Sequence, residues 1–162
     1  MVEAWRPGRA QARNWALAAE AALWLTLAGL ALRTLPFARI AALAGIWPRR
    51  ERGPCIDPDG RAAQRIGWAV EAAARRAPWP ALCFEQGLAA HLMLRRRGWQ
   101  PTLCYGARSD GAAGPSAHVW VRLDGRDVVG GEEAHRYALL ATFPEPRAGA
   151  PVRSHLTTHQ ET

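Results

Sequence analysis

The pattern of hydrophobic and polar positions changes once along the chain, close to Gly98. Before Gly98, apolar residues fill long stretches or recur at helical spacing, whereas after it they alternate with polar residues. The pattern predicts helices at about 15–33, 37–45, 60–77 and 81–97, and strands at 101–107, 117–123 and 126–129. Helices followed by an antiparallel sheet are typical of the α+β class.

Breaker and cap residues define the ends of these elements. Pro36 ends the first helix, because proline disfavours helical backbone at the residue before it. Asp57 or Asp59 is suited to cap the third helix, and Gly98 is suited to end the fourth. Asp124-Gly125 is a strong signal for a hairpin turn between two strands.

At 162 residues, the chain is long enough for one domain with a modest core. Residues 132–140 are predicted as a short helix after the last strand. We expect a single domain with N-terminal helices (1–46), a linker loop rich in proline and charge (47–60), a core of helices and strands (61–145) and a flexible tail (146–162).

The segment from Trp15 to Leu32 contains one charged residue, Glu20, and is close in length to a membrane span. Its alanine content and Glu20 favour a helix buried within the protein. The alternative is membrane contact through this helix, because arginines precede and follow it. A signal peptide is not indicated, since the segment starts late and lacks a clean small-residue cleavage site.

Charge and cysteine content argue against several classes of function. The formal net charge is +7, from 21 basic and 14 acidic residues, and every basic residue is arginine. The arginines are scattered and not interleaved with aromatic residues, which argues against a nucleic-acid-binding protein. The 3 cysteines, an odd and sparse number, indicate a reducing compartment, so we expect a cytoplasmic protein. Their spacing is not typical of a metal site, and we expect no bound metal.

Cys83 and His118 form the candidate chemical site. Cys83 lies at the start of a predicted helix, where unpaired backbone N–H groups and the helix dipole favour the thiolate. His118 lies in the alternating segment AHVWVRLDG, and a histidine on a neighbouring strand can hold the proton that the thiol loses. Either residue alone is more often structural. Their order along the chain favours a cysteine hydrolase.

The other cysteines and histidines fit these roles less well. Cys55 lies in the linker loop, and Cys104 lies in the middle of a predicted strand, where we expect it to face the core. His91 follows Cys83 on the same predicted helix, and we expect it on the solvated face. His135 lacks a matching partner along the chain.

A third group is needed to fix the orientation of the His118 ring. Asp127 shares the face of His118, but it lies roughly 13 Å away along the paired strands. With a one-residue bulge in the hairpin, Glu132 lies directly opposite His118, whereas without it Glu133 is the diagonal neighbour. A backbone carbonyl or Gln86 is a further candidate. We take Glu132 as the candidate orienting residue, the alternative being a glutamate that stabilises a helix start.

An oxyanion hole needs two donors close to the nucleophile. The backbone N–H of Cys83 is the first candidate. The indole N–H of Trp79, just upstream, is the second, with simple packing as its alternative role.

These segments together resemble the lasso-peptide leader peptidases (B proteins), a family of transglutaminase-like cysteine proteases. The resemblance covers about residues 78–131 and rests on WPALC, GLAAHLMLRRRG, TLCYGARS and AHVWVRLDGRDVVGG. It implies a transglutaminase/papain-like core in which a small antiparallel sheet packs on the cysteine helix, with Cys83 as nucleophile and His118 as general base. The aspartate that the family often has after the hairpin has no counterpart here, because the segment reads Val128-Val129-Gly130-Gly131.

The resemblance also implies a reaction and a set of partners. The reaction is removal of the leader from a ribosomally made precursor peptide in the bacterial cytoplasm. The segment before Pro78 shows no strand pattern, so the chain resembles the stand-alone peptidase form, which works with a separate leader-recognition protein. An ATP-dependent lasso cyclase that closes the macrolactam ring is a further implied partner. No phosphate-binding loop occurs in this chain, so we expect no ATP or other cofactor bound to it.

Two alternatives stay open at this point. Another transglutaminase-like activity, amide hydrolysis or acyl transfer to an amine, would use the same cysteine and histidine with a different acceptor. The second alternative is a non-catalytic scaffold of the maturation complex, in which Cys83 is structural.

Overall fold

The computed structural model describes residues 9–36, 39–40, 59–109 and 114–144. Helices come first along the chain, and strands follow after residue 101. The elements are α1 (Arg9–Thr34), α3 (Arg61–Ala74), α4 (Cys83–Arg96), β1 (Thr102–Ser109), β2 (Pro115–Leu123), β3 (Arg126–Val129), the 3-10 turn η2 (Ala134–Arg136) and β4 (Ala138–Phe143). The predicted α+β class is therefore confirmed.

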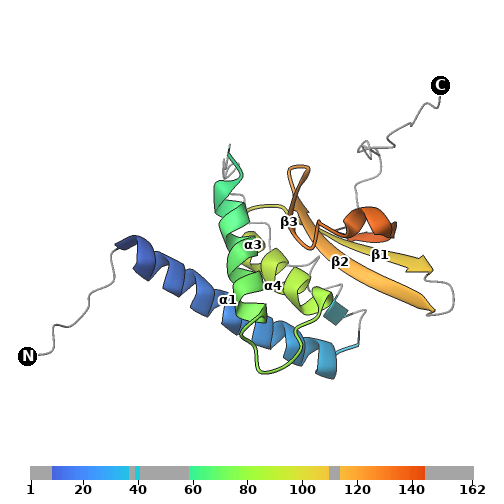
Figure 1. Ribbon diagram of the computed structural model, residues 1–162, viewed down its shortest axis with the longest axis horizontal. Helices are drawn as coiled ribbons and strands as arrows, with labels where there is room; N and C mark the ends of the chain where they lie inside the picture. Colours follow the sequence, from blue (N-terminus) through green and yellow to red (C-terminus); the bar gives the residue numbers. More distant parts are fainter. Residues whose placement is uncertain (1–8, 37–38, 41–58, 110–113, 145–162) are drawn as a thin grey trace, which may run out of the picture.

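The strands form an antiparallel sheet in the order β3-β2-β1-β4, with the helices gathered beside it (Figure 1). Helix α4 contacts β2, and α3 contacts β3. Strand β1 pairs with β2 along the whole of β1, from Thr102 opposite Arg122 to Ser109 opposite Pro115. The predicted hairpin is confirmed, because Asp124-Gly125 takes positive φ angles of 50° and 81°, as a two-residue turn of this kind requires.

Alternating strand positions pack against the helices. Leu103, Val119 and Val121 lie in the main apolar core together with Ile66 of α3. A Cβ atom at Gly87 would lie 2.6 Å from Cγ1 of Val119, so the absence of a side chain lets α4 approach β2 this closely. Because successive side chains of a strand point to opposite faces, this packing fixes which face of β2 each residue occupies.

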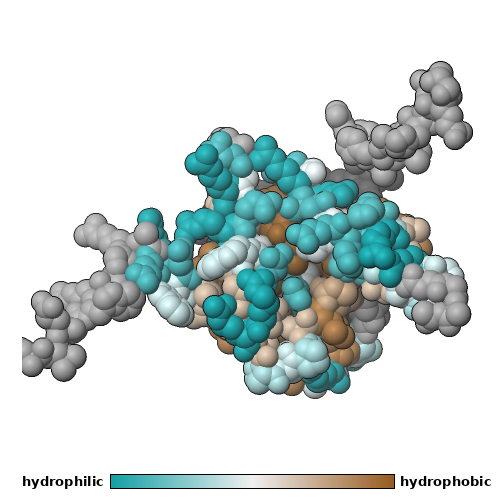
Figure 2. All heavy atoms as spheres, viewed as in Figure 1, coloured by the Kyte–Doolittle hydropathy of each residue, from teal (hydrophilic) through white to brown (hydrophobic). Residues whose placement is uncertain are grey.

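Helix α1 is buried on one face and exposed on the other. Ala21 and Leu25 are buried against the helical core, whereas Leu23 and Leu30 are 58% and 57% exposed. By length and composition, Gln11–Thr34 also qualifies as a membrane span, as a core helix of a soluble protein can. Figure 2 shows apolar side chains reaching the surface in the lower half of the view, below a mostly hydrophilic upper half.

The single acidic residue of α1 ties this helix to the end of α4. The guanidinium of Arg97 donates to both carboxylate oxygens of Glu20, at 3.0 and 2.6 Å. The hydrogen bond from Arg97 lowers the pKa of Glu20. Glu20, the one charged residue in the apolar segment of α1, therefore forms an ion pair that holds α1 against the C-terminal end of α4.

Three local predictions are wrong, two of them for a tertiary reason. The residue that caps α3 is Gly60, in the left-handed conformation, while Asp59 lies 3.9 Å from Arg61. The predicted helix at 132–140 is instead η2 followed by β4, because pairing with the open edge of β1 stabilises a strand. His91 is fully buried rather than solvated, since α4 is enclosed by α1, α3 and the sheet.

Several predictions concern segments outside the described residues. They are most of the second predicted helix at 37–45, most of the linker loop at 47–60 including Cys55 and Asp57, and the predicted tail at 146–162.

Candidate active site

Cys83 is the first residue of α4, as the sequence predicted. The carboxylate of Glu85 accepts a hydrogen bond from the backbone N–H of Leu82 at 3.1 Å, which stabilises the start of the helix. Cys83 is a free, partly buried cysteine that packs against the main apolar core. The thiol therefore lies at the positive end of the α4 helix dipole.

His118 lies on β2, on the face opposite to the neighbouring Val119, which packs in the helical core. Its ring stacks on Trp120 and Tyr137, with centroids 6.1 and 5.0 Å away. Its Nε2 lies 2.7 Å from the carbonyl oxygen of Gly130. Because a carbonyl only accepts, Nε2 carries the proton in the neutral ring, and Nδ1 is the basic nitrogen.

An open groove of about 440 Å³ runs past His118 at the β3 edge of the sheet. Its other walls are the segment from Asp127 to Glu133 and three residues of α3, namely Gln64, Trp68 and Glu71. Sequence reasoning missed these α3 residues, although their helical spacing places them on one face. Cys83 does not line this groove, and no hydrogen bond joins its thiol to the His118 ring among the residues the structure describes.

The carbonyl of Gly130 occupies the orienting position for which the sequence offered several candidates. A register shift between Val121 and Arg122 supplies the one-residue bulge, but β3 ends at Val129, before Glu132 can pair with His118. Glu132 is exposed at the groove wall. The backbone carbonyl weighed as an alternative is thus the group in contact with the ring.

Two further candidates for this position, Asp127 and Gln86, are held elsewhere. The carboxylate of Asp127 accepts a hydrogen bond from Nε of Arg122 at 2.8 Å, and this bond raises the pKa of Arg122. The amide of Gln86 donates to the carbonyl of Ala81 at 2.8 Å. Neither side chain contacts the His118 ring in the described structure.

Cys104 is buried in β1, as predicted. Burial raises the pKa of its thiol to about 11, so the thiol stays protonated at neutral pH. It therefore lacks the thiolate character that a nucleophile needs.

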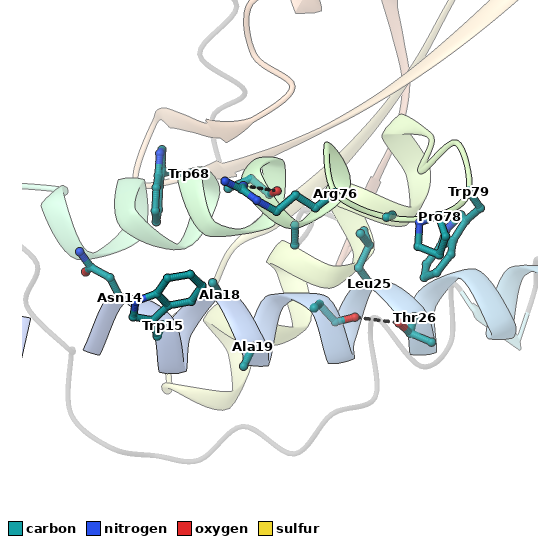
Figure 3. A pocket seen from close by; sticks show the side chains of 14 residues that line it. Asn14, Trp15, Ala18, Ala19, Leu25, Thr26, Trp68, Arg76, Pro78 and Trp79 are labelled. Atoms are coloured by element: carbon teal, nitrogen blue, oxygen red, sulfur yellow. Dashed lines mark hydrogen bonds between the residues drawn. The ribbon is translucent and has the colours of Figure 1, made fainter. Parts of the chain in front are cut away.

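Trp79, the candidate second oxyanion donor, lines a different cavity. Its indole lies between α1 and the end of α3, in a groove that does not include Cys83 (Figure 3). Its Nε1 is buried and has no hydrogen-bond partner among the described residues. The predicted role of Trp79 as the second oxyanion donor therefore stays a prediction.

A family model described as the transglutaminase-like superfamily matches residues 6–142. The chain belongs to the transglutaminase-like superfamily. The match covers α1 as well as the cysteine helix and most of the sheet, so the N-terminal helix is part of the transglutaminase-like core. Searches of curated proteins and of solved structures found no match. Within the described residues, no group of three or more histidine, cysteine or acidic side chains could hold a metal ion.

Proposed function

We propose that this transglutaminase-like protein is a cysteine peptidase that removes the leader from a lasso-peptide precursor. The observation that carries the proposal is the position of Cys83, the first residue of α4 in a core of this superfamily. The superfamily supports cysteine-dependent chemistry on amide bonds, and the sequence resemblance supports the leader peptide as substrate.

In the proposed reaction, the thiolate of Cys83 attacks the scissile carbonyl and forms a C–S bond. The tetrahedral oxyanion is stabilised by the backbone N–H of Cys83 and a second donor. His118, protonated on Nδ1, gives that proton to the leaving amine as the C–N bond breaks. Water then adds to the thioester, His118 takes its proton, and the carboxylate of the leader leaves as the thiolate is restored.

The contact between His118 and Gly130 has a specific role in this scheme. A carbonyl oxygen facing Nε2 holds the ring in the tautomer whose Nδ1 is free to exchange protons. Catalysis requires Nδ1 and the Cys83 thiol to meet over the bound peptide. In the structure the His118 ring lies on the face of β2 opposite to the helical core in which Cys83 packs, so the reaction requires a rearrangement that brings the ring to the thiol.

The proposal includes partners and a location. A separate leader-recognition protein would deliver the precursor, and an ATP-dependent cyclase would use the freed N-terminus of the core peptide. The sparse cysteines support a reducing bacterial cytoplasm as the location.

The non-catalytic scaffold is the second candidate, favoured by the lack of a Cys83–His118 hydrogen bond in the described residues. Mass spectrometry of a precursor peptide separates the two, with a leader-recognition protein from a neighbouring gene present. Wild type and Cys104→Ala should release leader and core, whereas Cys83→Ala should not. Cleavage by Cys83→Ala overturns the thiol mechanism, and no cleavage by any variant favours the scaffold. The same assay is repeated with an amine added. A leader product that carries this amine on the carbonyl of the cleaved bond indicates acyl transfer instead of hydrolysis.

A further inference from the structure

Helix α1 has one charged side chain, Glu20, between Arg13 and Arg33, and the described part of the protein covers only one side of this apolar stretch. The exposed positions recur at three- and four-residue spacing, which places them together on the other side of the helix. This outer face consists of Ala16, Ala19, Leu23, Thr26, Leu27 and Leu30. A helix that is apolar all round is expected in a protein interior or in contact with lipid. The composition of the outer face therefore calls for an apolar partner.

The hydroxyl groups along the outer face are satisfied within the helix. The Thr26 hydroxyl donates to the carbonyl oxygen of Ala22 at 2.8 Å. The Thr34 hydroxyl, one turn beyond Leu30, donates to the carbonyl oxygen of Leu30, also at 2.8 Å. A hydroxyl that is bonded in this way does not need water as a partner. The outer face can therefore enter an apolar medium without leaving these two groups unpaired.

Guanidinium groups border the outer face on both sides. Thr26 lines a groove together with Arg76 of α3, which places Arg76 along one edge of the face. On the other edge, Arg96 lies 3.9 Å from the carboxylate of Glu20, which Arg97 already binds at 2.6 Å. Two guanidinium groups share one carboxylate there, so one positive charge is left over along this edge.

An apolar strip between guanidinium groups matches the surface of an anionic lipid bilayer. Apolar side chains enter the boundary of the acyl chains, while arginines are attracted to the lipid phosphate groups. Trp15, which immediately precedes the outer face, is 65% exposed. Exposed tryptophans at the end of an apolar segment are typical of the membrane–water interface.

A second copy of the chain fits this surface less well. A symmetric α1–α1 contact would bring together the bordering arginines of two chains, each with a formal net charge of +7. The carboxylates of Glu20 and Glu85 are already paired with Arg97 and Arg33. Like charges across an interface oppose association. The charge pattern therefore favours lipid over a homodimer.

The packing of α1 determines how a bilayer would meet it. Ala21 and Leu25 are buried in the main core, and Glu20 is bound to Arg97 in the middle of the helix. Crossing the membrane would break these contacts and carry the Glu20 carboxylate into the hydrocarbon region. Helices α3 and α4 lie between α1 and the sheet (Figure 1), so a helix lying in the membrane plane leaves the sheet facing away from the lipid.

We propose that the outer face of α1 docks on an anionic lipid bilayer, with the helix axis in the plane of the membrane–water interface. Leu23, Leu27 and Leu30 insert among the acyl chains, while Arg76 and Arg96 contact lipid phosphate groups. No residue of the outer face lines the groove that contains His118, so docking does not occupy that groove. The proposal does not depend on the peptidase function.

The test uses the full-length protein with vesicles of phosphatidylcholine, either alone or mixed with phosphatidylglycerol, and measures binding by flotation. The outer-face variant is Leu23→Gln/Leu30→Gln. Its matched control, Leu139→Gln/Leu140→Gln, removes two exposed leucines from β4. Arg76→Gln tests the charge at the border of the outer face. Thermal unfolding of each variant verifies that it is folded.

We expect the wild-type chain to bind the anionic vesicles at least about tenfold more tightly than the neutral ones, and less tightly as salt rises. The outer-face variant should bind the anionic vesicles about tenfold or more weakly, because two leucines no longer insert. Arg76→Gln should weaken this binding about fivefold. The β4 variant should change it by less than about twofold.

Three results with lipid would overturn the proposal. They are absent binding to anionic vesicles, an equal loss of binding in the outer-face and β4 variants, and resistance of the bound protein to alkaline carbonate, which indicates a spanning helix. Analytical ultracentrifugation without lipid tests for a second copy on the same face. A dimer that dissociates in the outer-face variant but not in the β4 variant would assign this face to self-association instead.

Discussion

The Nε2 atom of His118 lies 2.7 Å from the carbonyl oxygen of Gly130. The contact favours the tautomer of the ring with the proton on Nε2, because a carbonyl oxygen only accepts. In the proposed peptidase mechanism it would orient the ring in place of an acidic side chain. Gly130 is also sensitive to substitution, because its φ is 71° and an added Cβ would lie 2.7 Å from the carbonyl oxygen of Val119.

We predict that Gly130→Ala disturbs both stability and the ring. The matched control is Gly125→Ala, where φ is 81° but an added Cβ meets nothing within 4 Å. Both changes introduce left-handed strain of about 1 kcal/mol, and Gly130→Ala should cost at least about 1 kcal/mol more through its clash. Urea unfolding measures the difference, and nitrogen NMR reports the tautomer. An Nδ1–H tautomer of His118 in the wild type would contradict the orientation argument.

We predict that the two described thiols differ sharply in reactivity. In a Cys55→Ser background, iodoacetamide near neutral pH should alkylate Cys83 in the folded protein. Cys104 should react only after unfolding, because it is buried and its pKa is raised to about 11. Peptide mapping by mass spectrometry assigns each site. Faster labelling of Cys104 than of Cys83 is incompatible with the proposed nucleophile.

The coupling between the Cys83 thiol and the His118 ring is tested by the rate at which Cys83 is alkylated near neutral pH. If His118 holds the proton of Cys83, His118→Gln should slow alkylation near neutral pH by about tenfold. The control is His135→Gln on η2, outside the groove that contains His118, which should leave the rate unchanged. Equal rates in wild type and His118→Gln would show that the two residues are not coupled.

We predict that the Glu20–Arg97 pair stabilises the fold above acidic pH. The pKa of Glu20 is lowered in the folded state from an ordinary value of 4.5. The stabilisation from ionised Glu20 is therefore complete at pH values above the pKa of Glu20 in the unfolded chain. It is lost as the pH falls through the lower pKa of Glu20 in the folded protein. Glu20→Gln should cost about 1 kcal/mol near neutral pH and progressively less in acid.

Urea unfolding of wild type and Glu20→Gln across this pH range gives the measurement. Glu133→Gln is the control, because Glu133 forms an exposed pair with Arg136 at 3.4 Å, and such pairs contribute little. A Glu20→Gln cost that grows on acidification would refute the assigned sign.

We predict that two helix glycines differ in their response to alanine. A Cβ at Gly67 of α3 would lie against the backbone carbonyl oxygen of Val128, so Gly67→Ala should cost more than about 2 kcal/mol. At Gly29 of α1 the nearest atoms belong to the exposed Arg33 guanidinium and to the buried Glu85 carboxylate, which are side-chain atoms. Because side chains can shift more easily than backbone and alanine has the better helix propensity, Gly29→Ala should cost about 1 kcal/mol or less. Thermal unfolding compares them, and similar losses would contradict the close α3–β3 packing.

Local sequence determined the elements that carry the candidate chemistry. Prolines at positions 78 and 80 separate α3 from α4, so α4 begins at Cys83. Alternation and the Asp124-Gly125 turn placed His118 on a strand that returns as a hairpin. These features depend on backbone conformations that neighbouring residues impose, which is why a short stretch of sequence was sufficient.

Tertiary structure decided the contacts that the chain makes across distance. Residues 138–143 became a strand because the edge of β1 offered partners, and His91 became buried because α4 is enclosed on several sides. The bulge in β2–β3 pairing gave His118 a carbonyl instead of a carboxylate. The groove between α1 and α3 joins residues far apart in sequence, so only the packed fold could create it. Pairing and packing of this kind depend on which surfaces meet, and local pattern does not specify that.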